Sequence, residues 1–146
     1  MEDYHIIRGD LFLRMNEENS CCHYHIEIQS LADERMAIRM LEYGFNKAKS
    51  LEKLNQEKDE IVLYMPKQLV IYIEESKTIQ DELRLRLVFP DGQEVKYIVP
   101  VMKYWEYSNQ DIIHKKIYPL LPLQVYKLKR KLHNVKKRVG DNSAEL

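Results

Sequence analysis

The amino-acid sequence predicts an α+β (α/β) fold with a mixed central β-sheet flanked by helices and with further helices at the C-terminus. Three observations carry this prediction. Residues 9–29 alternate as two strands around a polar turn, residues 34–48 step at helical spacing, and residues 69–73 are almost continuously apolar. A short apolar run of that kind is typical of a strand buried on both faces, and hence central in a sheet covered by helices.

The first element is a hairpin whose turn, residues 16–20, is polar and contains two asparagines. On its second strand, apolar side chains at positions 24, 26 and 28 alternate with polar ones at 23, 25, 27 and 29. A turn centred between Glu18 and Asn19 places Asp10 opposite Glu27. Directly opposed residues have Cβ atoms roughly 4.5–5.5 Å apart. The two carboxylates would therefore repel unless a divalent cation such as Mg²⁺ lay between them.

The second strand of the hairpin also carries residue types that bind zinc. Cys21, Cys22 and His23 are followed by His25, and alternation places three of these four on one face. Zinc requires a fourth ligand, usually from a second paired motif, and the sequence has no second cysteine pair. We interpret these residues as ordinary strand residues beside a polar cleft, with a zinc site as the minor alternative.

The period changes after the hairpin. Ser30 followed by Asp33 and Glu34 predicts a helix N-cap with acids in the first turn, and apolar or small residues then recur at positions 37, 40, 44 and 48. Arg39 and Tyr43 are four residues apart and therefore neighbours on this helix. Arg39 has two interpretations. It contacts phosphate or orients a carboxylate of the site, or its stem packs against Tyr43 at a partly exposed position.

Later segments complete the predicted sheet. Residues 51–60 are charged, which predicts a helix end or a loop, and residues 69–73 form the buried strand. Residues 83–89 and 95–99 alternate on either side of Pro90-Asp91-Gly92-Gln93. That turn sequence between two alternating runs predicts an amphipathic β-hairpin.

From residue 108 the chain is predicted to be largely helical, with interruptions at Pro119 and Pro122. This segment carries an apolar stripe at helical spacing, made of Leu121, Val125, Leu128, Leu132, Val135 and Val139. The stripe packs within the protein or pairs two chains as a homodimer. The basic residues around it, including Lys129 and Arg130, form a solvated face or contact phosphate. We divide the chain into a core, residues 1–107, and a helical extension of the same domain, residues 108–146.

Composition bounds the class of protein. The chain has 146 residues, which fits one domain, and its formal net charge is zero, so bulk electrostatics give no argument for nucleic acid. The N-terminus is acidic where a signal peptide is basic, and no apolar run approaches the roughly 18 residues of a membrane span. We therefore expect no membrane partner. Two adjacent cysteines exclude a disulfide framework and favour a cytoplasmic setting.

An ordered set of segments resembles a known family. Asp10 followed by Glu27-x-Gln29 on a strand is similar to the core of the PD-(D/E)XK nuclease superfamily, with Gln29 at the position that is usually lysine. HIEIQS (25–30), ERMAIRMLEYGF (34–45), VIYIEE (70–75), FPDGQEVKYIVPV (89–101) and YPLLPLQ (118–124) together resemble the recombination-promoting nuclease (Rpn) family of transposase-like proteins. The resemblance covers most of the chain.

The resemblance implies a restriction-endonuclease-like core and metal-dependent cleavage of DNA. It implies that Asp10 and Glu27, with a backbone carbonyl near Ile28, hold Mg²⁺ or Mn²⁺. Gln29 would complete the catalytic set by orienting water, because a neutral amide cannot act as a general base. Weaker DNA contacts are expected at Arg39, which belongs to the family's Arg-Met-x-x-Tyr element, and at the basic pair Lys129 and Arg130.

The start of the chain departs from the family. The family's pattern places a helix, with an acid that completes the metal site, before the first catalytic acid, and residues 1–8 are too short for it. Two alternatives follow: a catalytically inactive, truncated relative, and an interaction module that dimerises through the C-terminal stripe. Pro90-Asp91 with Glu94-Val95-Lys96 also spells a nuclease motif. The turn accounts for those residues, so a site there is a minor alternative.

Overall fold

The computed structural model describes residues 8–17, 20–51, 56–57, 60–125, 128 and 132. The chain forms two compact units, Met1–Lys103 and Tyr104–Leu146, and each is considered separately. Within the described part of the chain, no helix has both the length and the apolar character needed to cross a membrane.

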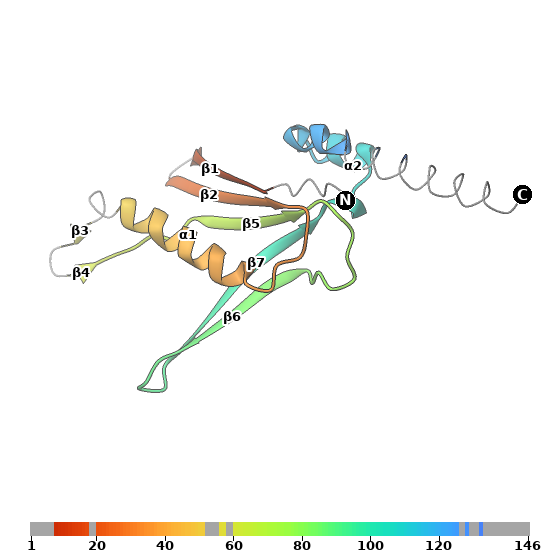
Figure 1. Ribbon diagram of the computed structural model, residues 1–146. Helices are drawn as coiled ribbons and strands as arrows, with labels where there is room; N and C mark the ends of the chain where they lie inside the picture. Colours follow the sequence, from red (N-terminus) through yellow and green to blue (C-terminus); the bar gives the residue numbers. More distant parts are fainter. Residues whose placement is uncertain are drawn as a thin grey trace, which may run out of the picture. The chain divides into compact units, whose positions relative to one another are not determined.

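The first unit holds a five-stranded mixed sheet, which confirms the predicted fold class (Figure 1). Its strands are β1 (Arg8–Glu17), β2 (Ser20–Gln29), β5 (Lys67–Tyr72), β6 (Glu82–Val88) and β7 (Glu94–Lys103), in the spatial order β1-β2-β5-β7-β6. β1 pairs antiparallel with β2 and β6 with β7, while β5 runs parallel to both β2 and β7. β5 is therefore the central strand, as its apolar run predicts. A separate two-stranded ribbon joins β3 (Gln56–Glu57) to β4 (Glu60–Ile61).

Helix α1 (Met36–Ser50) lies over one face of this sheet (Figure 1). Its buried side repeats every four residues, at Met36, Met40, Gly44 and Ala48. This spacing keeps the four positions on one face of the helix, which explains why that face is the buried one.

The predicted N-cap of this helix is wrong. The N-cap residue is Arg35, which makes no side-chain capping hydrogen bond, and the first turn contains no acid. Asp33 instead precedes the helix, where its Oδ1 accepts the Arg35 backbone N–H at 2.9 Å. Its Oδ2 accepts a hydrogen bond from Arg39 at 3.0 Å. The Asp33 carboxylate thus bonds an arginine that lies one turn into the helix. Ser30, the predicted N-cap, is buried at the end of β2.

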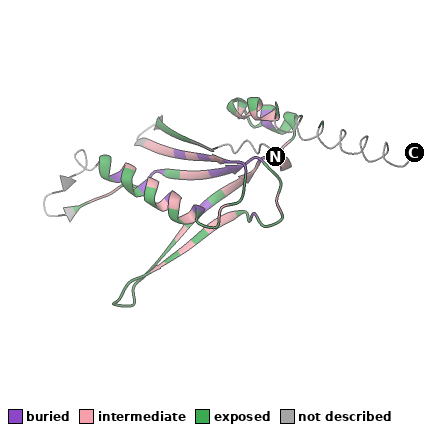
Figure 2. Ribbon diagram, in the orientation of Figure 1, coloured by how far each residue is buried: buried purple, intermediate pink, exposed green. Residues whose placement is uncertain are grey.

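The polar face of β2 is its buried face. His25, Glu27 and Gln29 are all classed as buried, while the alternating apolar residues of the strand are only partly buried. Figure 2 shows buried positions gathered on β2, β5 and the sheet-facing side of α1. Buried polar side chains require hydrogen-bond partners or ligands. The buried polar side chains that could bind a ligand therefore lie in the layer between β2 and α1.

The predicted hairpin at residues 83–99 is confirmed as β6 and β7, and Figure 1 shows that it extends beyond the rest of the sheet. Gly92 adopts φ 86°, a left-handed conformation that glycine tolerates best. Asp91 Oδ1 accepts the Gln93 backbone N–H at 3.0 Å. Asp91, Glu94 and Lys96 are exposed, so the nuclease-like spelling falls on a turn and its flank.

The second unit begins with the 3₁₀ turn η2 (Tyr104–Glu106), followed by α2 (Asn109–His114) and η3 (Tyr118–Leu123). Ser108 and Asp111 form a reciprocal capping box at the start of α2. Both prolines lie within η3, and Leu120 O accepts a hydrogen bond from Tyr104 Oη at 2.7 Å. In the apolar stripe, positions 125, 128 and 132 are exposed. Val135, Val139, Lys129 and Arg130 lie outside the described residues, so the homodimer and the basic contacts stay predictions.

Candidate functional site

The register of β1 and β2 places Asp10 directly opposite Glu27, as the hairpin turn predicts. His25 lies on the same face of β2 as Glu27, because the two residues are two positions apart on a strand, with one residue between them. One ligand atom from each of Asp10, His25 and Glu27 lies within 4.8 Å of the others. The structure therefore brings together the two predicted acids and adds His25, which the sequence pattern predicts to be an ordinary strand residue. Its spacing from Glu27 was the signal that could have identified it.

The three side chains differ in their contact with solvent. Glu27 and His25 are 1% and 0% exposed, whereas Asp10 is 43% exposed on the edge strand β1. His25 Nε2 is 3.9 Å from Asp10 Oδ1 and 4.0 Å from Glu27 Oε2, beyond direct hydrogen-bond distance. Within the described part of the chain, Nε2 and Oε2 are buried without a hydrogen-bond partner. An unpaired buried carboxylate oxygen is costly, and it marks a position where a cation would be stabilised.

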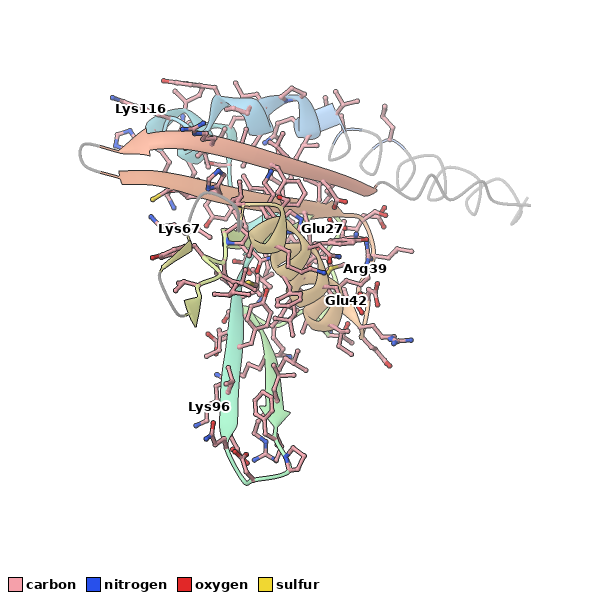
Figure 3. The ribbon with its side chains drawn as sticks, turned by 90° about the vertical axis from the view of Figure 1, so that its left-hand side faces the viewer. Glu27, Arg39, Glu42, Lys67, Lys96 and Lys116 are labelled. Atoms are coloured by element: carbon pink, nitrogen blue, oxygen red, sulfur yellow. The ribbon has the colours of Figure 1, made fainter. Side chains whose placement is uncertain are left out.

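The other oxygen of Glu27 is fully engaged. Oε1 accepts hydrogen bonds from Arg39 Nη2 at 3.0 Å and from Gln29 Nε2. Figure 3 shows Arg39 on α1 beside Glu27 on β2. Arg39 Nη1 also bonds Asp33, and its guanidinium carbon lies 5.7 Å from the centre of the Tyr43 ring. Arg39 thus orients a site carboxylate, one of its two predicted interpretations, and it retains its neighbour on the helix. Gln29 contacts the same oxygen and also orients Glu27.

The ring of His25 is held on several sides. It stacks on Phe12 with ring centres 4.4 Å apart and planes 6° from parallel, and Tyr43 meets it edge-on at 5.7 Å. Its Nδ1 lies 2.9 Å from Gln68 Nε2 on β5. Burial lowers the pKa of His25, and the nearby Asp10 carboxylate opposes part of this shift. The ring is accordingly neutral at neutral pH.

The pH dependence of stability should report this burial. The pKa of folded His25 lies below its ordinary value of 6.5, so the unfolded chain binds a proton more readily. The contribution of His25 to the free energy of unfolding is therefore present above pH 6.5 and is lost as pH falls through the folded pKa. We expect urea unfolding between about pH 7.5 and about pH 5.5 to show a smaller loss in His25→Gln than in the wild type. Equal losses in the two proteins would contradict a buried, neutral His25.

The remaining predicted positions do not join this cluster. Among the described side chains, only Asp10, His25 and Glu27 form a group of metal-binding types, so no zinc cluster assembles around Cys22 and His23. The side chain of Cys21, together with Lys129 and Arg130, lies outside the described residues. Comparison of the chain with protein-family models, with curated proteins and with solved structures finds no match.

Proposed function

We propose that Asp10 and Glu27 bind Mg²⁺ or Mn²⁺, and that the protein is a metal-dependent DNA endonuclease, a phosphodiester hydrolase of the recombination-promoting type. The observation that carries this proposal is the unpaired, buried Oε2 of Glu27 opposite the carboxylate of Asp10. Mg²⁺ is typically held by one or two carboxylates, with waters and substrate phosphates completing its shell. The two carboxylates fit that donor set. The resemblance of the ordered segments supports DNA as the substrate.

When bound, the metal would polarise the scissile phosphate and lower the pKa of the attacking water. The chain's own residues have separate roles. Asp10 is 43% exposed, so its carboxylate is accessible from solvent. Arg39 and Gln29 hold Oε1 of Glu27 and leave Oε2 available. Gln29 acts by hydrogen bonding alone, because an amide does not exchange a proton in this pH range.

DNA contact is assigned to local cations, since the chain carries no net charge. Arg39 is the proposed contact at the cluster, where it pairs with Glu27, and Lys129 and Arg130 are the proposed contacts of the C-terminal segment. We place the activity in the cytoplasm, in keeping with a sequence whose two cysteines are adjacent.

The metal site is tested by urea unfolding with and without Mg²⁺ in wild type, Asp10→Asn and Glu42→Gln. A ligand specific for the folded state stabilises it by about 2.7 kcal/mol at a hundredfold excess over Kd. We expect this stabilisation in the wild type and its loss in Asp10→Asn. Glu42→Gln is the matched control, because Glu42 is an exposed acid on α1 outside the cluster (Figure 3). Equal Mg²⁺ stabilisation of Asp10→Asn and wild type would remove the proposed site.

The endonuclease activity is tested on the same three proteins with supercoiled plasmid DNA and Mg²⁺. We expect nicking by wild type and Glu42→Gln and none by Asp10→Asn. Mg²⁺ stabilisation of the wild type without nicking would keep the metal site and favour the catalytically inactive relative.

A further inference from the structure

The side chain of Gln68 lies beside the ring of His25 and bears on which ring nitrogen carries the proton. The two residues are register partners on the parallel strands β2 and β5. The amide of Gln68 has its own anchors: Nε2 donates to Met40 O at 2.6 Å, and Oε1 accepts from the hydroxyl of Tyr97. A backbone carbonyl can only accept a hydrogen bond, so the amide nitrogen must face Met40. The contacts with Met40 and Tyr97 therefore fix the orientation of this amide independently of His25.

The same nitrogen lies 2.9 Å from His25 Nδ1. Its second hydrogen is directed to Nδ1, which must then be the unprotonated nitrogen of a neutral ring. The ring proton consequently resides on Nε2. That nitrogen is the one that lies near Asp10 and Glu27, so its hydrogen faces two acceptors. The contact at Nδ1 and the charges near Nε2 favour the same tautomer.

Histidines that bind metals have the opposite arrangement. Their non-ligating nitrogen carries the hydrogen and donates it to a carboxylate or a carbonyl, which leaves a lone pair on the nitrogen that faces the metal. Here a donor occupies the position where such an acceptor would lie. The nitrogen next to the carboxylates therefore carries a hydrogen and has no free lone pair.

We propose that Gln68 holds His25 in the Nε2-protonated tautomer, which keeps the ring from ligating the metal and makes the cluster select Mg²⁺ or Mn²⁺ over Zn²⁺. Carboxylate and water oxygens suit Mg²⁺ and Mn²⁺, whereas imidazole nitrogen favours Zn²⁺. Gln68 and His25 are positioning residues in this account. The tautomer rests on the described contacts alone, and the metal preference rests also on the proposed function.

The tautomer can be measured directly on the full-length, metal-free protein. Long-range ¹H–¹⁵N NMR correlations distinguish a protonated from an unprotonated ring nitrogen. At about pH 7.5, where histidine is ordinarily neutral, we expect His25 to show a protonated Nε2 and an unprotonated Nδ1. A protonated Nδ1 in the wild type would overturn the proposal.

The role of Gln68 is tested with Gln68→Glu. A carboxylate at this position can only accept, so it should draw the proton to Nδ1 and leave the Nε2 lone pair facing Asp10 and Glu27. We expect the ratio of Zn²⁺ to Mg²⁺ affinity to rise by about tenfold to a hundredfold, the range seen when groups behind metal ligands change. The ratio is the readout, because an added negative charge strengthens binding of both metals. Tyr97→Phe is the control: it removes another contact of the same amide and should change neither the tautomer nor the ratio.

The outcomes separate this proposal from the proposed function. A protonated Nε2 in a wild type that Mg²⁺ does not stabilise would contradict the metal site and leave the tautomer standing. A protonated Nδ1 in a wild type that Mg²⁺ does stabilise would contradict the role of Gln68 alone. If Gln68→Glu does not fold, wild type decides the matter: Zn²⁺ that binds at His25 Nε2 there, seen as a shift of that resonance, overturns the proposal, and its absence supports it.

Discussion

Replacing Arg39 with methionine should lower the free energy of unfolding by about 3–5 kcal/mol, the usual cost of removing one partner of a buried ion pair. The partner that stays behind is Glu27, whose side chain is 1% exposed, while that of Arg39 is 22% exposed. Methionine keeps an unbranched stem that can pack against Tyr43, so the loss isolates the guanidinium. Glu27 would then have only Gln29 as a donor to Oε1.

Urea unfolding measures this effect, and two further variants define its cause. Arg84→Met removes the same group from an exposed pair with Glu82, where Arg84 is 78% exposed, and it should cost no more than about 1 kcal/mol. Adding Glu27→Gln to Arg39→Met should recover much of the lost stability, because no buried charge is then left. An Arg39→Met protein with the urea midpoint of the wild type would show that the pair does not hold Glu27 in place.

Gly44→Leu should be the second strongly destabilising change, at about 3 kcal/mol. A Cβ at this buried position would lie 2.8 Å from Met65 Cε and 2.9 Å from both Gln68 amide atoms. Gln68 cannot move away freely, since it makes three hydrogen bonds, each worth about 1 kcal/mol. Overpacking adds roughly 1–3 kcal/mol, and the better helix propensity of leucine returns less than about 1 kcal/mol.

Glu42→Leu is the matched control for this prediction, because it places the same side chain on an exposed position of α1. It should leave the urea midpoint nearly unchanged. In Gly44→Leu the ring nitrogens of His25 should also lose the NMR signature of the wild type, since Gln68 is displaced. A fully stable Gly44→Leu protein would show that the amide of Gln68 has room to move.

Local pattern determined the hairpins and the central strand. Alternation with period two and a polar turn are short-range properties, so residues 9–29 specify both the pairing of β1 with β2 and the opposition of Asp10 and Glu27. The continuous apolar run of β5 specified its central place in the same way. The glycine-containing turn specified the hairpin of β6 and β7. These predictions needed no contact between distant segments.

The sequence alone thus determined the fold class and the pair of acids, and the tertiary structure decided what surrounds them. The hydrogen bond from Arg39 to a carboxylate of the site depends on how α1 lies over β2. The same packing buries the polar face of that strand. The sequence shows that position 25 is a histidine. Which of its ring nitrogens carries the proton depends on Gln68, which lies 43 positions further along the chain. The strands that carry these two residues are parallel and are joined through a helix, so they are not paired by a local turn. The hydrogen bond between His25 and Gln68 depends on the packing of the sheet, and neither strand's sequence pattern predicts it. The physical reason is one of range: strand pairing across a turn is encoded locally, whereas the tautomer of a buried histidine is set by whichever side chain the fold brings to it.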